Sequence, residues 1–333
     1  MRDISYFKAM KEALAEEMRR DEKVFMIGES IQGGAFLYSK GLVEEFGTDR
    51  IMDAPVAESG IVGGGVGSAL TGYRPIVDLL FSDFMYSAGD EIFLKAAQWR
   101  FIHGGKLRMP LVILAAVGGG LMLGNEHSQT PCAMVLHKAG LKLAVPSNPY
   151  DAKGLLKTAI RDDNPVMYFW HKALAHMPAS QGNKIAEAVS WSGVPDEEYT
   201  IPFGVADVKK EGSDVTVVAV SNMVNIALSI ARELEGAIDV EVIDPRTLEP
   251  LDLETILKSV EKTRRLVIAD EDMQRCSFAS ELGFQVMEHS LDHLIAPIKR
   301  VCAANYPIPG GFIEKHVLPQ PAQVKRAIEE VMR

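Results

Sequence analysis

Short apolar runs alternate with amphipathic stretches along most of the chain, a pattern typical of an α/β fold. Near the N-terminus, Phe7, Met10, Leu14 and Met18 recur at helical spacing among charged residues and predict a helix. In the first half, buried strands are then predicted at 24–27, 51–52, 75–80, 111–115 and 166–169, with helices at 90–100 and 151–160. The second half repeats this order, with strands at 215–220, 240–243, 266–269 and 298–302 and helices at 224–234, 253–260, 280–290 and 322–332.

The alternation fades between about residues 173 and 203, where proline and glycine replace periodic apolar positions. The sequence therefore predicts two domains, 1–180 and 203–333, joined by a linker or irregular segment at 181–202. With 333 residues, of which 47% are hydrophobic and 24% charged, both domains can bury a core.

Charge and cysteine usage narrow the function classes. A net charge of -10, without any basic block interleaved with aromatics, argues against nucleic-acid binding. The apolar stretch at 109–124 is too short to span a bilayer, and the amphipathic N-terminus does not resemble a signal peptide, so no membrane segment is expected. Cys132, Cys276 and Cys302 are far apart and lack metal-ligand spacing, which predicts buried thiols in a reducing cytoplasm.

Glu58 is the first candidate for chemistry, because it follows a predicted strand and opens a glycine-dense helical segment. Open α/β sheets place their ligands at this end of the strands. The run of Gly60, Gly63, Gly64, Gly65 and Gly67 has no side chains, so another backbone or a flat ligand can approach closely and desolvate the acid. Alternatively, Glu58 is an ordinary first-turn glutamate that the helix dipole favours.

Several common motifs are missing. The glycine run fails the dinucleotide template, since Ser68 stands where the third glycine is needed, and this disfavours a nicotinamide oxidoreductase. There is no Walker loop, and Gly89-Asp90-Glu91 comes nearest to the Gly-Asp-Gly of a magnesium-diphosphate site. The eight histidines lack metal-ligand spacing, so no metal site is predicted.

Four further residues stand at predicted strand ends, where their side chains can meet. Phe81 and Phe84 can present a flat face to a heteroaromatic ring, although core packing is the commoner role. His127, in a glycine-flanked loop, can act as an acid or base near neutral pH or be structural. Glu29 follows the first buried strand.

The candidate residues lie in longer segments, which are IGES at 27–30, APVAESGIVG at 54–63, FSDF at 81–84, AAQWR at 96–100, HSQ at 127–129, GLKLAVPSNPYDAKGLLKTAIRDDNPV at 140–166, IPFGVADVKKEGSDVTVVAVSNMV at 201–224 and VEVIDPRTLEPLD at 240–252. Together and in order, these segments resemble the β chain of the decarboxylating, thiamine-diphosphate-dependent component of 2-oxo acid dehydrogenase complexes. The similarity covers nearly the whole chain, and the family includes acetoin dehydrogenases and, more distantly, the second half of transketolases. It implies a transketolase-like pyrimidine-binding domain with a parallel sheet, followed by a transketolase C-terminal-type α/β domain.

The resemblance also implies roles. Glu58 would hydrogen-bond the pyrimidine ring nitrogen of thiamine diphosphate, so that the cofactor serves as its own base. Phe84, aided by Phe81, would stack on the pyrimidine, and His127 would face the substrate and assist proton transfer or acyl handover. Glu29 resembles an acidic residue between the two active sites of the tetramer.

The implied activity is that of an oxidoreductase acting on an oxo group, with oxidative decarboxylation of a 2-oxo acid and acyl transfer to the lipoamide of an acyltransferase core. It requires an α subunit, which would hold Mg2+ and the diphosphate in a heterotetramer of two α and two β chains. The backbone at 161–165 resembles a segment that ligates a structural monovalent cation in some relatives.

Departures from the family pattern leave the substrate open. Asn125 and Glu126 replace residues that often include a second histidine, and Trp170 stands where relatives carry Glu; these positions are expected to line or border the substrate loop. Glu126 would add negative charge near an anionic substrate. Acetoin cleavage by an acetoin dehydrogenase β subunit is therefore the alternative, and a non-catalytic assembly subunit of the same fold is a further one.

Overall fold

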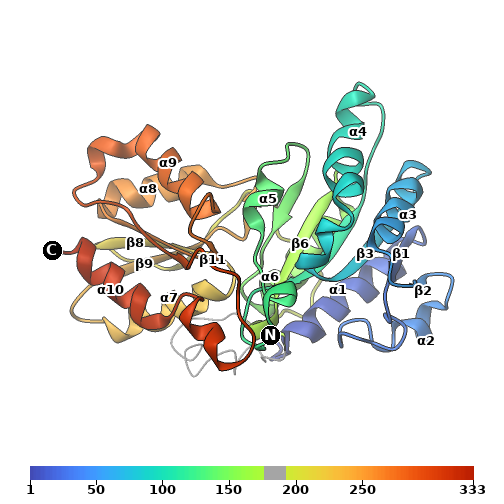
Figure 1. The fold of residues 1–333 in the computed structure, drawn as a ribbon, viewed down its shortest axis with the longest axis horizontal. Coiled ribbons are helices and arrows are strands. Elements are labelled where there is room, and N and C mark those ends of the chain that lie inside the picture. The colour runs from blue at the N-terminus through green and yellow to red at the C-terminus, as the bar shows by residue number, and fades with distance from the viewer. Residues whose placement is uncertain (176–192) are drawn as a thin grey trace.

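The computed structural model describes residues 1–175 and 193–333 and shows two α/β lobes side by side (Figure 1). Part of the predicted linker, residues 181–192, lies outside the described residues. The strands of the first lobe are β1 (Val24–Gly28), β2 (Ile51–Asp53), β3 (Arg74–Phe81), β4 (Val112–Val117), β5 (Lys142–Ala144) and β6 (Val166–His171). Its helices and helical turns are α1 (Tyr6–Arg20), α2 (Leu42–Phe46), α3 (Glu58–Leu70), η1 (Ser82–Tyr86), η2 (Glu91–Ala96), α4 (Ala97–Ile102), η3 (Asn125–His127), α5 (Cys132–Leu136), α6 (Pro149–Arg161) and η4 (Lys172–Leu174).

The second lobe is built in the same way. Its strands are β7 (Asp207–Lys210), β8 (Val215–Ala219), β9 (Val240–Asp244), β10 (Thr247–Glu249), β11 (Leu266–Met273) and β12 (Lys299–Ala303). Its helices and helical turns are α7 (Asn222–Glu233), α8 (Leu253–Thr263), α9 (Phe278–Ser290), η6 (Leu291–His293), η7 (Gly311–His316) and α10 (Pro321–Val331). The two sheets have the strand orders β10-β5-β6-β4-β3-β1-β2 and β12-β11-β8-β9-β7.

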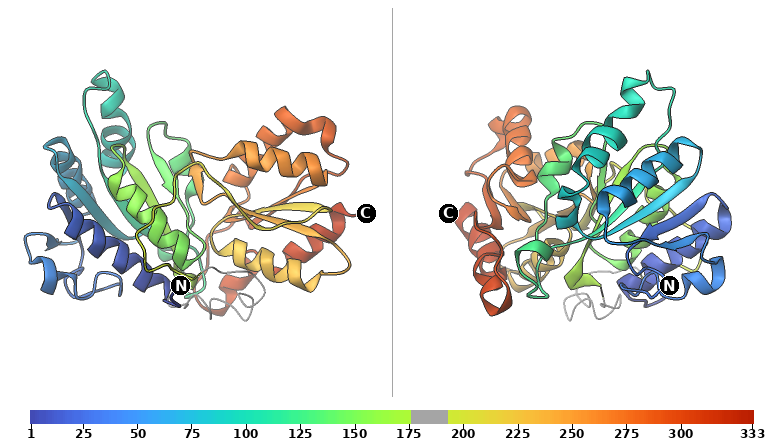
Figure 2. Two further views of the ribbon diagram at one scale, coloured as in Figure 1. Left: turned by 180° about the vertical axis from the view of Figure 1, so that it is seen from behind. Right: turned by 45° about the vertical axis from the view of Figure 1, so that its right-hand side comes forward.

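Each sheet is covered on both faces, as the apolar strand runs predict. On β4, Val112, Leu114 and Ala116 face the core beneath α1 and α6, whereas the alternate residues face the core beneath α3 and η2. Figure 2 shows α1 and α6 lying together on one face of this sheet. The inner strands are parallel, so their carboxyl ends gather at one edge of the sheet, where ligands of open α/β sheets bind.

The two-lobed α/β fold and the order of its long elements confirm the prediction, but three short strands were not predicted. β5 and β10 have three residues each, and β7 carries two charged lysines, so none shows an apolar pattern. β10 follows β9 in sequence and yet pairs antiparallel with β5, which adds it to the sheet of the first lobe. The helix predicted at 90–100 is a π-helix, η2, continued by α4.

The thiols differ from the prediction in one case. Cys132 is buried and Cys302 is half-buried, but Cys276 is exposed. Cys276 has a positive φ of 55° just after β11, where the chain turns at the protein surface. Over the described ranges, no helix has both the length and the apolar character needed to cross a bilayer.

Candidate active site

Glu58 is the first residue of α3, as predicted, and it follows the carboxyl end of β2. Its side chain is half-buried. On the inner side of α3, Gly65 allows the helix to approach the sheet, because a Cβ there would lie 2.6 Å from Cγ2 of Val77. On the outer side, nothing lies within 4 Å of a Cβ added at Gly64 or Gly67. The surface beside Glu58 is thus open to a ligand or a second chain.

Ser87 joins Glu58 to the aromatic residues of η1. Its hydroxyl lies 3.1 Å from Oε2 of Glu58 and 2.9 Å from the carbonyl oxygen of Phe84. The single hydroxyl proton of Ser87 can go to either acceptor, and when it goes to Glu58 it restricts the rotation of the carboxylate. The sequence analysis missed Ser87, because a lone serine after an aromatic turn carries no motif.

Glu29 follows β1, and the charge of Glu58 affects its pKa. Burial and, second, the negative charge of Glu58 raise the pKa of the Glu29 carboxyl. Two like charges therefore share this edge of the sheet, which makes it easier for a proton to bind there. The structure brings together the two acids that the sequence placed at separate strand ends.

Phe81, Phe84 and His127 form a compact cluster of three rings. The ring centroids of Phe81 and Phe84 are 5.7 Å apart. The His127 centroid lies 4.6 Å from that of Phe81 and 5.4 Å from that of Phe84. All three pairs meet edge to face, with interplanar angles of 75–80°. Such pairs are each worth about 0.5–1.5 kcal/mol beyond burial, so they orient the imidazole.

The sequence analysis predicted that Trp170 lines or borders the substrate loop, but its side chain lies in the core and does not line an open surface. It is only 1% exposed and packs edge to face on Phe36, with a centroid separation of 4.7 Å. Phe36 in turn contacts Phe81 at 5.7 Å. The reason is the position of Trp170 on the central strand β6, whose residues are buried on both faces. Asn125 and Glu126, by contrast, are exposed in η3 beside His127.

The segment at 161–165 has a cationic partner within the chain. Nη1 of Arg74 donates to the carbonyl oxygens of Ile160 and Asp162, each 3.1 Å away. In the described part of the chain, no group of three or more His, Cys, Asp or Glu side chains is arranged to hold a metal ion. The monovalent cation therefore stays a prediction.

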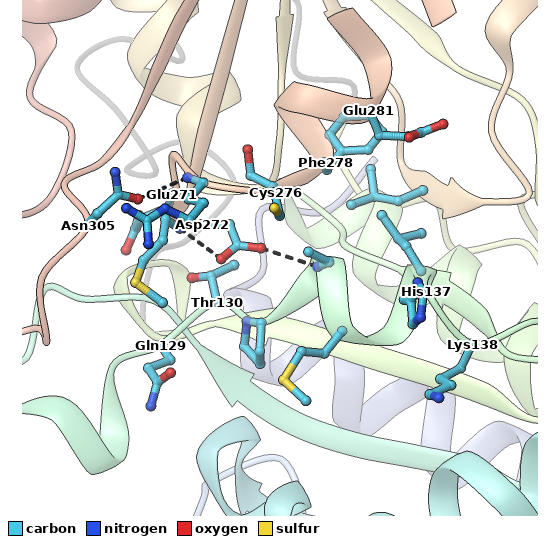
Figure 3. A pocket seen from close by; sticks show the side chains of 18 of the residues that line it. Gln129, Thr130, His137, Lys138, Glu271, Asp272, Cys276, Phe278, Glu281 and Asn305 are labelled. Atoms are coloured by element: carbon cyan, nitrogen blue, oxygen red, sulfur yellow. Dashed lines mark hydrogen bonds between the residues drawn. The ribbon is translucent and has the colours of Figure 1, made fainter. Parts of the chain in front are cut away.

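A cavity of about 970 Å3 opens next to the ring cluster, between the lobes. Tyr86, Asn125 and Gln129 line it from the first lobe, and Asp272 and Cys276 line it from the second. Figure 3 shows Gln129, Asp272 and Cys276 around the cavity. Burial and the neighbouring Asp270 raise the pKa of Asp272 to about 7. Asp272 accepts a hydrogen bond from the main-chain N–H of Ala133, which ties the second lobe to α5.

Comparison with known proteins agrees with this architecture. The transketolase pyrimidine binding domain matches residues 2–177, and the transketolase C-terminal domain matches residues 204–324. A solved structure described as a split-gene transketolase in an inactive β4 tetramer superposes with a TM-score of 0.78 at 21% identity and covers 99% of both chains. At that identity, the likeness shows the fold.

Curated relatives are closer in sequence. The β subunit of acetoin:2,6-dichlorophenolindophenol oxidoreductase from Bacillus subtilis is 40% identical, over 99% of this chain and 98% of the relative. The β subunit of 2-oxoisovalerate dehydrogenase from the same organism is 39% identical, over 98% of this chain and 98% of the relative. The β subunit of its pyruvate dehydrogenase E1 component is 36% identical, over 100% of this chain and 99% of the relative. From the matched domains and these relatives, we conclude that the chain belongs to the transketolase-type family of β subunits of 2-oxo acid and acetoin dehydrogenases.

Proposed function

We propose that this chain is the β subunit of a thiamine-diphosphate-dependent component that oxidatively decarboxylates a 2-oxo acid and transfers the acyl group to a lipoyl group. The observation that carries the proposal is the placement of Glu58 and its Ser87 donor directly beside the cluster of Phe81, Phe84 and His127. An acid, an aromatic surface and a titratable imidazole at one edge of a sheet match the needs of the pyrimidine half of this cofactor.

The residues present fit that half. Phe84 is half-buried and offers ring surface on the open side of the first lobe. The Glu58 carboxylate would hold a proton at the pyrimidine ring nitrogen, and Ser87 would keep the carboxylate in place. When bound, thiamine diphosphate supplies the nucleophilic carbon that attacks the oxo group of the substrate.

The remaining chemistry falls to side chains of this chain. His127, held edge to face by the two phenylalanines, would exchange a proton with the substrate oxygen or assist the acyl handover. Glu29 would take up or release protons behind Glu58, because its pKa is raised by burial and by the Glu58 charge.

An α subunit would complete the site. It would supply Mg2+ and the diphosphate contacts, in a heterotetramer of two α and two β chains that docks on a lipoyl-bearing acyltransferase core in the cytoplasm. The open outer surface of α3 beside Glu58 supports this division, since a second chain can approach there without displacing side chains.

Acetoin is the second candidate substrate. Glu126 is exposed one residue before His127 and adds negative charge where a 2-oxo acid would bring its carboxylate. A neutral substrate avoids that repulsion. An assembly subunit without catalysis is a third reading, against which the presence of Glu58 and His127 weighs.

Calorimetric titration with thiamine diphosphate and Mg2+ tests the proposal, using the lone chain, its complex with the candidate α chain, and the complex carrying Glu58→Ala. We expect binding at roughly micromolar Kd for the wild-type complex alone and a loss of about a hundredfold in the variant, equivalent to about 2.7 kcal/mol. Glu254→Ala is the matched control, since Glu254 also lies in the first turn of a helix but pairs with the exposed Lys258 of α8.

A panel of pyruvate, branched-chain 2-oxo acids and acetoin with an artificial electron acceptor then identifies the substrate. Tight binding by the lone chain, or none by the complex, would overturn the proposal. Binding without turnover of any substrate would favour the assembly subunit.

A further inference from the structure

Lys172 is a buried cation directed at the backbone of the candidate active site. It is 3% exposed, and its ammonium donates to the carbonyl oxygen of His127 and, at 3.4 Å, to the hydroxyl of Ser128. The same ammonium lies 5.4 Å from the ring centroid of Phe81. Burying an ammonium costs several kcal/mol unless it is well solvated by protein groups, so these contacts hold it firmly.

The second lobe fixes the start of the loop that carries His127. The N–H of Gly119 donates to Oε1 of Glu271 at 2.6 Å, and the N–H of Gly120 donates to Oε2 of Glu314 at 3.0 Å. Both carboxylates belong to the second lobe. The N–H of Gly118 donates to the carbonyl oxygen of Gln129 at 3.1 Å and closes the loop at its base.

The carboxylate of Glu271 also orients His171, the residue before Lys172. Nδ1 of His171 accepts a hydrogen bond from the N–H of Ala173 at 3.1 Å, so its Nε2 carries the proton and donates to Oε2 of Glu271 at 2.9 Å. Because the His171 ring is only 2% exposed and bonded through both nitrogens, the backbone at Lys172 cannot rotate freely. A continuous path of contacts thus runs from Glu271 through His171 and Lys172 to His127.

From this path we propose that Lys172 is a positioning residue, which holds the His127 segment so that the imidazole stays packed against Phe81 and Phe84 at the site. The inference deepens the proposed function and rests on it for the catalytic role of His127. Two of the three ammonium donors of Lys172 go to the main chain and hydroxyl of residues 127 and 128, so its contacts tie it to this segment.

The charge of Lys172 gives the proposal a measurable pH signature. Burial lowers the pKa of Lys172 to about 8, against the opposing charges of Asp83, Glu314 and Glu271. From the His127 segment, the carbonyl oxygen of His127 contacts the ammonium. The imidazole of His171, the residue before Lys172, bonds Glu271. The ammonium is present below this pKa and is lost as the pH rises through it, so the hold on His127 weakens above about pH 8.

The test compares complexes of the α chain with wild-type chain, Lys172→Met and Lys172→Arg. For Lys172→Met we expect kcat to fall about 10–100-fold, because a misplacement of about 1 Å has that effect on catalysis, while the Kd for thiamine diphosphate changes less than about threefold. Lys172→Arg, which keeps its charge, should recover part of kcat and move the alkaline fall of activity to higher pH.

Lys153→Met is the control for simple loss of a buried lysine. Lys153 is 1% exposed, but it pairs with Glu16 at 2.6 Å on α1, away from the ring cluster. A kcat for Lys172→Met within about twofold of wild type, or a fall in kcat no larger than that of Lys153→Met at the same Tm, would overturn the proposal.

The two proposals fail in different ways. If the wild-type complex binds no cofactor and turns over no substrate, the proposed function fails, and the positioning of His127 is then read from its imidazole resonances in the full-length chain. Changed His127 resonances in Lys172→Met, with those of His289 and His293 unaltered, support the inference, and unchanged His127 resonances refute it.

Discussion

Gly118→Ala is expected to destabilise the protein more than the same substitution at a positive-φ glycine whose added Cβ would contact no other atom. Gly118 follows β4 with φ = 81°, and a Cβ there would lie 2.0 Å from Nε2 of the His171 ring. The ring cannot move aside cheaply, because it is buried and its two nitrogens bond Glu271 and Ala173. The left-handed backbone alone costs an alanine about 1–2 kcal/mol. Overpacking adds about 1–3 kcal/mol.

Gly104→Ala separates these two costs. Gly104 has a similar positive φ of 64°, but nothing lies within 4 Å of a Cβ built on it. It should therefore show the backbone cost alone. The difference of about 1–3 kcal/mol corresponds to a Tm for Gly118→Ala that is about 2–12 °C lower than that of Gly104→Ala.

Differential scanning calorimetry of the full chain in one buffer measures this difference. Equal Tm values for the two variants would refute the reasoning, because they would mean that His171 yields without cost. Since Gly118 also closes the base of the His127 loop through Gln129, Gly118→Ala should in addition lower kcat of the complex, while Gly104→Ala should leave it near wild type.

Two further predictions concern buried and exposed titratable groups. Burial raises the pKa of Asp78 from its ordinary 3.8 to about 6, so between these values the folded chain binds more protons than the unfolded chain and Asp78 lowers stability as the pH rises. Asp78→Asn should stabilise the chain at pH 7 by roughly 3 kcal/mol and leave its stability unchanged near pH 3, which Tm measured across this pH range would show. A loss of stability at pH 7 would contradict this, because the hydrogen bond from Tyr38, 2.6 Å long, would then outweigh the cost of burying the charge. The native chain should react quickly with a thiol reagent at one cysteine, and Cys276→Ser should abolish this reaction, since Cys132 is buried and Cys302 half-buried; fast labelling of the Ser variant would contradict the exposure pattern.

The site residues predicted from the sequence share one physical property. Glu29, Glu58 and Phe81 follow or end a strand, and His127 lies in the loop between β4 and α5. The parallel strands bring these strand ends to one edge of the sheet. Pro55 and the glycine run mark the start of α3, so the position of Glu58 followed from local signals. Their catalytic roles and the domain boundaries at 180 and 203 stay predictions.

What the sequence analysis missed depends on contacts between distant segments. Lys172 bonds a carbonyl oxygen 45 residues earlier in the chain, and Glu271 bonds an amide 152 residues earlier. Neither lies in a motif, because a lysine or glutamate acting on the backbone needs no particular spacing. Trp170 was misplaced for the same reason: its burial is set by Phe7, Phe36 and Tyr38 of other segments.

The arrangement of the acids argues that assembly and proton chemistry are coupled, if the proposed function holds. In this chain Glu58 is half-buried, and its negative charge raises the pKa of Glu29 across a surface that is open to solvent. A second chain packed on the bare outer side of α3 would remove water from both carboxyls and strengthen their repulsion. Loss of water and stronger repulsion both favour protonation of one of the two carboxyl groups. The proton affinity that the site needs would then arise only in the complex, so that the isolated subunit stays inactive even with all its own site residues in place.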